Sequence, residues 1–427
     1  MKNIFLFFCI LCVVLFSGAL VFAGGVDNRS NYSGEYVRTL NRNAATDSLD
    51  AIAYNPAGVM KMQNGLQGNL SVHYVLKDYS NTVNGVVLEQ DTPSFVPALF
   101  GLYKTDNWAG FFSFTIPAGG GKVDYDSGNA TTRIGSMIAA SILNTLYGPA
   151  SYNPADSSEQ LSAQSFYYGY TVGGAYKLND IFSVSLSGRY IDADKKADAL
   201  LELTPTSVGP MAGTPPAQVA LNYEDSAEGY GFILGMFIDY EPVTIGMRYE
   251  TETDLDFKYN VKQDTVGIGA LQGITDGLEH SRNLPALFAF GLGYQANARL
   301  KIDLNFTTYF QEDADWGGAE NNVENGWEAG IAVEYILNPR MKLSAGYLYT
   351  QTGMSARYAL KEAPELDANT FGAGFVYHVN ESLKIDCGIA MVDYESESYT
   401  DASLGTPIVI GLAKDVVMAA AGVQYHF

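Results

Sequence analysis

Three basic residues occupy positions at which a carboxylate could be bound. Arg189, Arg248 and Lys301 lie on the polar face of segments in which apolar and polar residues alternate. A charge entering a low-dielectric pocket is costly unless it is paired, and guanidinium and ammonium groups pair well with carboxylates. Acidic residues share these faces, so internal ion pairs are the alternative to ligand binding. The acidic residues are Asp192, Glu250 and Asp303.

The residue types needed for catalysis or for a metal centre form no recognisable pattern. No phosphate-binding loop is present, and glycine pairs such as Gly229 and Gly231 lie in strand-like segments rather than before a helix. We therefore expect a protein that is not an enzyme and that uses no metal and no cofactor. The histidines, which show no metal-ligand spacing, are His73, His280, His378 and His426.

The composition favours a surface that faces lipid. Of the 427 residues, 47% are hydrophobic and only 17% are charged, whereas soluble domains are usually about 25% charged. Acidic residues number 47 and basic residues 25, which gives a net charge of -22. Because nucleic-acid binding needs a basic surface, we expect no nucleic-acid partner.

The first 23 residues read as a secretory signal peptide. Lys2 precedes an apolar run over residues 4–22, and the run ends in the small residue Ala23, after which cleavage is expected. The alternative is an uncleaved anchor helix, since about 18 apolar residues can span a bilayer. Cys9 and Cys12 lie within the signal, so the mature chain would keep only Cys387 and could form no intrachain disulfide.

Period-two alternation recurs from residue 67 to the C-terminus and predicts strands with two different faces. In residues 299–310, for example, Leu300 and Ile302 alternate with the polar Lys301 and Asp303. Alternation alone fits either a soluble sandwich or a barrel. We count fourteen such segments: 67–79, 94–104, 107–117, 164–177, 181–195, 226–240, 242–259, 284–296, 299–311, 325–337, 340–352, 369–379, 382–395 and 414–427.

The connections between these segments favour a membrane β-barrel. Tight turns alternate with longer loops, and the number of strands is even, as in outer-membrane barrels, whereas a sandwich has no reason to keep that asymmetry. The long loops, expected outside the cell, are 118–163, 196–225 and 260–283. We therefore predict an all-β chain that crosses the bacterial outer membrane many times as about fourteen antiparallel strands, with membrane lipid around it.

The C-terminal strand ends in the apolar and aromatic residues Val423, Tyr425 and Phe427. A C-terminal aromatic residue resembles the assembly signal of bacterial outer-membrane barrels, so Phe427 predicts the barrel assembly machinery as a partner. Tyrosines near strand ends fit the aromatic girdles at the two membrane interfaces. They are Tyr103, Tyr176, Tyr240, Tyr249, Tyr294, Tyr335, Tyr347 and Tyr377.

A distinctive stretch, N-A-A-T-D-S-L-D-A-I-A-Y-N-P-A-G from Asn43 to Gly58, precedes the first strand. With the segments Gly229–Phe257 and Leu284-Pro285-Ala286, it resembles the FadL family of outer-membrane transporters for long-chain fatty acids and other hydrophobic compounds. The resemblance implies a signal peptide over 1–23, a hatch over 24–66 that plugs the lumen, and a barrel over 67–427. The hatch motif is Asn55, Pro56, Ala57 and Gly58, which acts either as a gate or as a turn that braces the plug.

The resemblance also implies a passive uptake path, from capture by the outer loops to binding in the lumen and sideways release. A helix over 133–147 would capture the substrate, and residues 261–283 would form the wall of the capture groove that faces this helix. The alternative is that the helix only packs on itself and caps the barrel mouth. The family kinks its third strand for release, and Gly110, Pro117 and Gly119 are the candidates here. Rival functions are a general polar porin and an adhesive or structural barrel. The apolar residues of the capture helix are Ile134, Met137, Ile138, Ile142 and Leu146.

Overall fold

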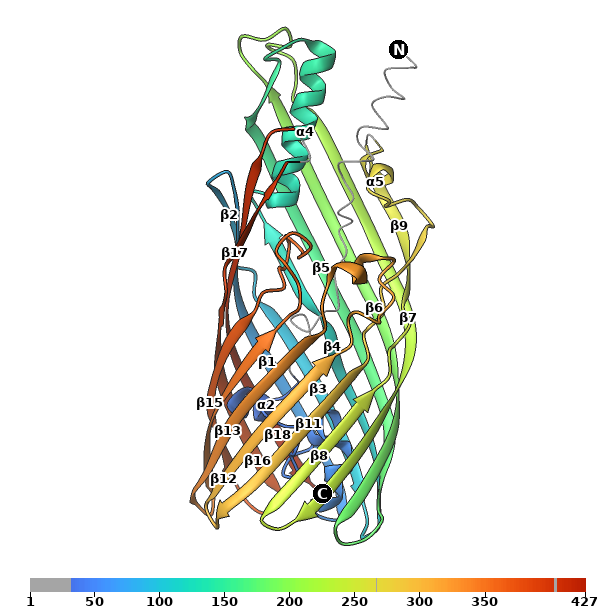
Figure 1. The fold of residues 1–427 in the computed structure, drawn as a ribbon, viewed down its shortest axis with the longest axis vertical. Coiled ribbons are helices and arrows are strands. Elements are labelled where there is room, and N and C mark those ends of the chain that lie inside the picture. Colours follow the sequence, from blue (N-terminus) through green and yellow to red (C-terminus); the bar gives the residue numbers. More distant parts are fainter. Residues whose placement is uncertain (1–31, 266, 403–404) are drawn as a thin grey trace.

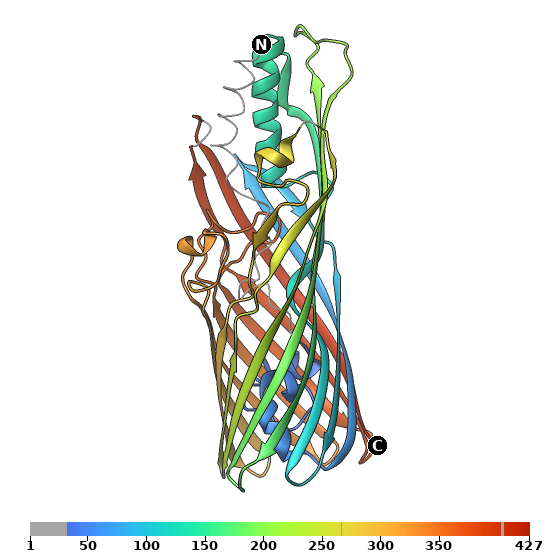
Figure 2. The ribbon, with the colours of Figure 1, turned by 90° about the vertical axis from the view of Figure 1, so that its right-hand side faces the viewer.

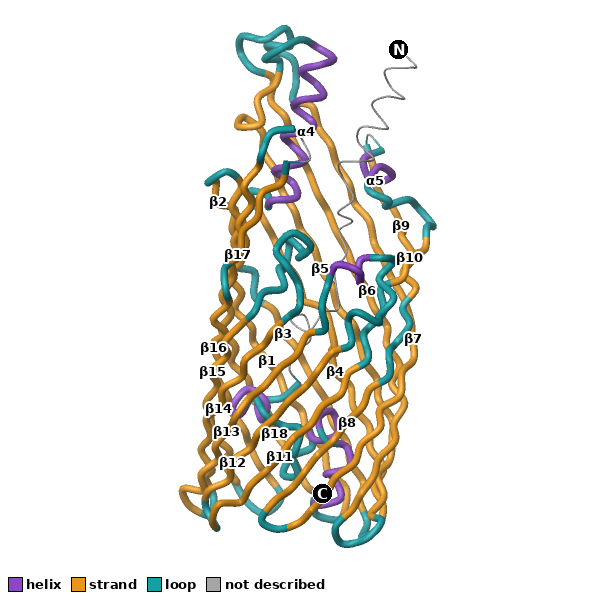
Figure 3. The backbone as a smooth tube through the Cα atoms, in the orientation of Figure 1, coloured by secondary structure: helices purple, strands orange, loops and turns teal. Residues whose placement is uncertain are grey.

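Long strands that close into a tall barrel dominate the structure, a computed structural model that describes residues 32–265, 267–402 and 405–427 (Figure 1, Figure 3). The wall has fourteen strand positions, all antiparallel, and it closes where β1 (Gly65–Val83) pairs with β18 (Ile408–His426). This confirms the predicted fold class. The predicted signal peptide and residues 24–31 of the predicted hatch lie outside the described residues.

The wall strands follow one another in chain order around the barrel. Between β1 and β18 they are β3 (Ser94–Lys104), β4 (Trp108–Tyr125), β5 (Tyr152–Lys177), β6 (Phe182–Pro205), β7 (Ala217–Tyr240), β8 (Val243–Glu250), β11 (Leu287–Asn297), β12 (Leu300–Tyr309), β13 (Gly326–Asn338), β14 (Met341–Gln351), β15 (Ala368–His378) and β16 (Leu383–Tyr394). Four shorter strands extend the wall on the long-loop side: β2 (Val86–Gln90), β9 (Asp256–Asp264), β10 (Glu279–Ser281) and β17 (Glu397–Asp401).

Residue alternation gives the wall two different faces. On β1, Leu70 and Val72 are exposed on the outer face, whereas Ser71 and His73 are buried inside the barrel. The outer apolar face suits lipid contact, and the inner face packs on the hatch. Six of the predicted girdle tyrosines are exposed near the short turns, at what is the periplasmic rim in an outer-membrane barrel. They are Tyr103, Tyr176, Tyr240, Tyr294, Tyr335 and Tyr377.

The strands run further than the sequence predicted on the long-loop side. Large parts of the predicted loops 118–163 and 196–225 are strand, and residues 256–264, which overlap the predicted loop 260–283, form β9. β5 and β6 stay paired as far as Tyr152 and Pro205. Each strand supplies hydrogen-bond partners to its neighbour, so a charged stretch such as residues 194–198 remains extended. The predicted strand 242–259 is also interrupted, because β8 ends at Glu250.

Helices lie inside the lumen and beside the extended strands on the long-loop side (Figure 2). The N-terminal ones are α2 (Gly34–Thr39), α3 (Ala51–Tyr54) and the 3-10 helix η2 (Pro56–Lys61); the others are α4 (Ala130–Tyr147), α5 (Ile268–Leu271) and the 3-10 helix η3 (Ala319–Asn322). The helix expected over 133–147 is confirmed as α4, and it starts earlier because Asn129 caps it through a bond from Thr132 N. None of the helices within the described ranges is long and apolar enough to span a membrane.

Candidate functional site

The hatch, residues 32–62, lies inside the turn-side part of the barrel (Figure 2). Its backbone runs directly against inward-facing glycines of the wall. A Cβ atom on Gly346 would overlap the carbonyl oxygen of Thr39, and one on Gly388 would lie 2.7 Å from Arg38 N. Glycine alone lets the two backbones approach this closely. This glycine belt, contributed by β8, β11, β13, β14, β15 and β16, consists of Gly246, Gly291, Gly330, Gly346, Gly372 and Gly388.

Buried ion pairs join the hatch to the wall. Arg38 of α2 is fully buried, and its NH1 lies 2.6 Å from Glu334 Oε2 of β13 while its NH2 contacts Glu35. Lys384 Nζ of β16 lies 2.9 Å from Glu35 Oε1. Burial alone would raise the pKa of Glu35, but the charges of Arg38 and Lys384 outweigh it and hold that pKa well below its usual 4.5. The stabilisation is therefore fully present at neutral pH and is lost only as the pH falls below that usual value.

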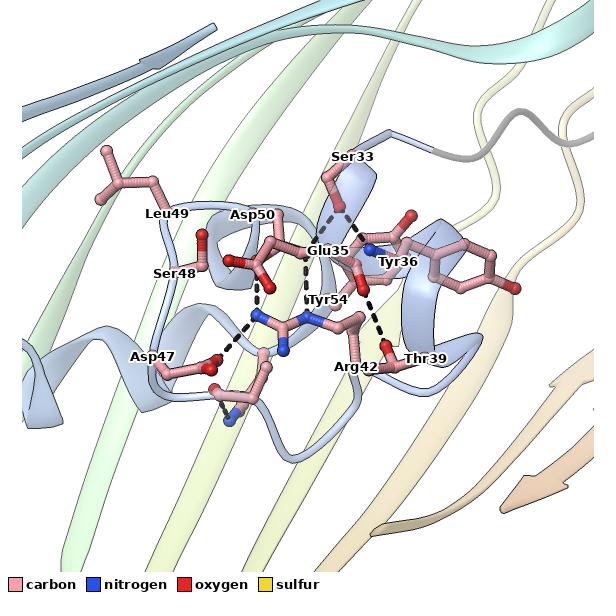
Figure 4. A network of polar contacts seen from close by, with 12 residues as sticks. Ser33, Glu35, Tyr36, Thr39, Arg42, Asp47, Ser48, Leu49, Asp50 and Tyr54 are labelled. Carbon is pink, nitrogen blue, oxygen red and sulfur yellow. Dashed lines mark hydrogen bonds and ion pairs between the residues drawn. The ribbon is translucent and has the colours of Figure 1, made fainter. Parts of the chain in front are cut away.

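A second set of ion pairs folds the hatch on itself (Figure 4). The guanidinium of Arg42 lies 2.7 Å from Asp50 Oδ1 and 2.9 Å from Asp47 Oδ1. Ser33 Oγ also donates to Asp50, at 2.7 Å. Sequence reasoning missed these anchors, although five charged residues within 35–50, in a chain poor in charge, were a usable signal.

The Asn55-Pro56-Ala57-Gly58 motif is buried against the wall. Asn55 Nδ2 donates to the carbonyl of Ala45 at 2.9 Å, and a Cβ on Gly58 would overlap that Asn55 amide. Ser183 Oγ of β6 donates to Ala57 O at 3.0 Å. The motif therefore makes a tight turn within the hatch and attaches it to β6.

The hatch separates two cavities of different character. Above it, a cavity of about 130 Å³ has Tyr36 and Leu40 of the hatch as its floor. Its sides combine polar and charged wall residues, including His73, Lys77 and Glu328, with apolar ones. The apolar ones include Val75, Leu348, Val392, Val416 and Met418. On the short-turn side, a second cavity is lined by charged groups, including Asp47, Lys61, Asp239, Glu334 and Lys342. The hatch and these charged groups therefore lie between the upper cavity and the short-turn end of the lumen.

The upper cavity borders a break in the wall between β3 and β4. These strands pair only from Leu99 with Phe114 to the short turn. Beyond this point, Thr115 of β4 pairs with Gly169 of β5, and Gly121 pairs with Ser165. Between these two pairs β4 advances by six residues, whereas β5 advances by only four. The two additional residues make β4 bulge, and four consecutive residues of this stretch are buried rather than alternating. They are Thr115, Ile116, Pro117 and Ala118.

An apolar groove lies on the long-loop side between α4, α5 and the extended strands. Thr132 and Gly135 form its α4 side, and Ile268 forms its α5 side. Leu201 and Leu221 of β6 and β7 form its base. The expected facing wall within residues 261–283 is therefore supplied by α5.

A sequence profile described as outer membrane protein transport protein (OMPP1/FadL/TodX) matches residues 16–427. The chain belongs to this FadL/TodX family. The resemblance found in the sequence is thereby confirmed, and family membership places the protein in the bacterial outer membrane as a transport barrel. No curated protein matches the sequence significantly.

Solved FadL/TodX-family structures share the fold. A Pseudomonas aeruginosa FadL homologue superposes with a TM-score of 0.69 at 15% identity, over 95% of this chain and 100% of the other. The Pseudomonas putida toluene transporter TodX gives 0.62 at 16%, over 89% and 94%. The Ralstonia pickettii toluene transporter TbuX gives 0.62 at 15%, over 94% and 99%.

The basic residues that sequence reasoning selected all form ion pairs in this FadL/TodX-family barrel. Arg189 NH1 and Arg248 Nε lie 2.7 and 3.1 Å from the carboxylate of Glu250. Arg248 also donates to the hatch carbonyl of Ala53. Lys301 Nζ lies 2.9 Å from Asp303. Within the described ranges, no group of three or more His, Cys, Asp or Glu side chains could hold a metal ion.

The other predicted residues fall at different places relative to the wall break and the outer groove. Pro117 and Gly119 lie in the β4 bulge, where Gly119 has a φ of +99°, whereas Gly110 sits in a regular part of the sheet, paired with Tyr103 and Gly174. None of the five apolar α4 residues lines the groove: Ile134 and Met137 pack on strand ends across the mouth, and Leu146 is exposed. Sequence reasoning missed Gly135, whose signal was a glycine inside a helical pattern.

Filling the groove tests its role in capture. Gly135→Phe would place a ring where a Cβ already approaches Leu201 at 3.3 Å. We expect binding of a hydrophobic probe to the purified protein to weaken about tenfold, a change of about 1.4 kcal/mol. Fluorescence titration measures it. Ser141→Phe adds the same ring at an exposed α4 position and should leave affinity unchanged; equal loss in both variants would exclude the groove as the capture site.

Proposed function

We propose that this barrel takes up hydrophobic small molecules passively and releases them sideways into the membrane between β3 and β4. The main support is that the cavity above the hatch has Val96 of β3 and Gly119 and Gly120 of β4 in its lining, so it reaches the wall where the strands are unpaired. A solute would enter from the outer groove, rest on the hatch and leave through this break.

The surroundings of the break support sideways release. Phe95 and Leu99, on the outer face of β3, are 63% and 44% exposed and would face lipid. A hydrophobic molecule crosses polar lipopolysaccharide poorly but gains favourable free energy in the hydrocarbon of the bilayer. The proposed path therefore ends in the apolar environment of the bilayer.

The substrate class we propose is aromatic or aliphatic hydrocarbons, with long-chain fatty acids as the second choice. TodX and TbuX are described as toluene transporters, and this likeness motivates the first class. The ion pairs of Arg189, Arg248 and Lys301 support it, because a carboxylate would have to displace an existing partner from each.

The hatch argues against the rival functions. A general polar porin needs an open aqueous lumen, which the hatch obstructs, and an adhesive barrel has no use for a cavity that reaches a break in the wall. We further propose that the C-terminal Phe427, which is 74% exposed, is read by the barrel assembly machinery.

Closing the break tests the proposal. Val96→Trp would place an indole in the cavity beside the β4 bulge. We expect uptake of a labelled hydrocarbon by cells to fall at least about tenfold, which corresponds to a barrier increase of about 1.4 kcal/mol. Uptake is measured in a deletion strain that carries wild type, variant or empty vector.

The matched control is Val72→Trp, which adds the same side chain on the lipid-facing side of β1. It should transport normally, and a heat-dependent gel shift should show that both variants fold. Uptake by the deletion strain at the parental rate would refute the function itself. Normal uptake by Val96→Trp would refute the exit at the break.

A further inference from the structure

Lys77 of β1 reaches across the wall break with a fully buried side chain. Its Nζ donates to Ser94 Oγ of β3 at 2.8 Å, and to two backbone carbonyls of β4, Gly120 O at 2.8 Å and Lys122 O at 2.6 Å. An ammonium group has three donors, and these contacts use all of them. The side chain therefore serves the wall rather than a solute in the adjoining cavity.

In a regular sheet, the carbonyls of Gly120 and Lys122 would accept hydrogen bonds from the backbone of β3. Beyond Phe114, however, β4 has no ladder to β3, and β3 itself ends its pairing with β1 at Val75 and Ser94. An unbonded carbonyl at membrane depth is costly. Lys77 lies on β1, which is separated from β4 by β3. Its ammonium group thus donates hydrogen bonds to the two β4 carbonyls that the bulge leaves without a partner on β3.

The geometry of Gly121 shows that β4 is held close at this point. A Cβ there would overlap Ser94 Oγ and lie 3.6 Å from Lys77 Nζ, and the φ of +78° also favours glycine. Two residues beyond Lys122, Asp124 N donates to Thr92 Oγ1 of the β2–β3 connection at 3.1 Å. Above the break, side chains of β1 and of the β2–β3 connection hold β4 in place, and below it the backbone ladder to β3 does.

We propose that Lys77 is the positioning residue that fixes the upper edge of the wall opening and so limits the girth of the molecules that can leave. The inference rests on the proposed exit between β3 and β4. Without the ammonium group, the upper arm of β4 would move away from β3, and the opening would be wider and more variable.

Distance measurements between spin labels test this without any transport assay. Labels replace Phe95 on β3 and Lys122 on β4, both exposed, in full-length protein with its native cysteines changed to serine. In Lys77→Met, we expect the distance distribution to broaden and its mean to lengthen by up to about 4.8 Å, one strand spacing. Lys77→Arg keeps the donors and should restore a narrow distribution.

A second label pair controls for general loosening. Leu99 and Phe112 flank the regular ladder below the break, and their distance should not change in any variant. Ser94→Ala removes one of the three acceptors and should give a smaller broadening than Lys77→Met. An unchanged distribution between positions 95 and 122 in Lys77→Met, or equal changes in both label pairs, would overturn the proposal.

Uptake separates this inference from the proposed function. In cells, the ratio of uptake of a branched to a linear hydrocarbon should rise in Lys77→Met and return in Lys77→Arg. If the deletion strain shows that the protein carries no hydrocarbon while the label distance still responds to Lys77→Met, the function fails and the structural role of Lys77 stands. If uptake depends on the protein but neither distance nor ratio responds, the role of Lys77 fails alone.

Discussion

Replacing Gly346 with alanine is expected to displace the hatch and to open the barrel to ions. The new Cβ would overlap the Thr39 carbonyl, and the atoms that it meets all belong to the Thr39 backbone, so no side chain can rotate away. Overpacking of this kind costs about 1–3 kcal/mol. This shifts the ratio of docked to undocked hatch roughly 5- to 150-fold. In planar bilayers, wild type should conduct little, whereas Gly346→Ala should show frequent large openings.

The matched control is Gly188→Ala on β6, where a Cβ would meet nothing within 4 Å. This variant makes the same Gly→Ala change within a strand, and it should show no large channel openings in planar bilayers. If Gly346→Ala folds, as shown by the heat-dependent gel shift, but shows no large channel openings, the glycine belt does not hold the hatch in place.

Removing the guanidinium of Arg38 should release the hatch from the wall. Arg38→Met keeps the length of the side chain but leaves the buried carboxylates of Glu35 and Glu334 without this partner. Breaking a buried pair from one side costs about 3–5 kcal/mol. We expect the N-terminal segment to become sensitive to protease added on the short-turn side, as measured by limited proteolysis and mass spectrometry.

Two further variants identify the cause. Arg340→Met changes an exposed arginine at a short turn and should leave the hatch protected. Adding Glu334→Gln to Arg38→Met removes one of the two buried carboxylates that have lost Arg38 as a partner, so part of the protection should return. A hatch equally protected in wild type and Arg38→Met would exclude these ion pairs as its main anchor.

The sequence predicted the barrel because its information is local. Alternation in residues 299–310 appears within one strand, and the structure has β12 at Leu300–Tyr309. The extension of β5 and β6 was not predicted, because charged residues there are extended only through pairing with each other. The local pattern therefore located the lipid-facing parts of the strands, but it predicted β5 and β6 to be shorter than they are.

The arrangement around the cavity depends on contacts that no local pattern records. The six glycines of the belt come from six strands and meet the hatch only when the barrel closes. Lys77 contacts carbonyls 43 and 45 residues further along the chain. For the basic residues, the sequence left ligand binding and internal pairing open. Only the three-dimensional structure shows that Arg189 pairs with Glu250 and Lys301 with Asp303.

Photo-labelling of the path tests sideways release most directly. Cells that express the protein would take up an alkane bearing a diazirine, and after irradiation the modified residues would be mapped by mass spectrometry. The account predicts labels around the break, on residues 94–99 of β3 and 115–121 of β4. Labels concentrated in the charged cavity below the hatch, on residues such as Asp239 and Lys342, would mean axial passage and would contradict it.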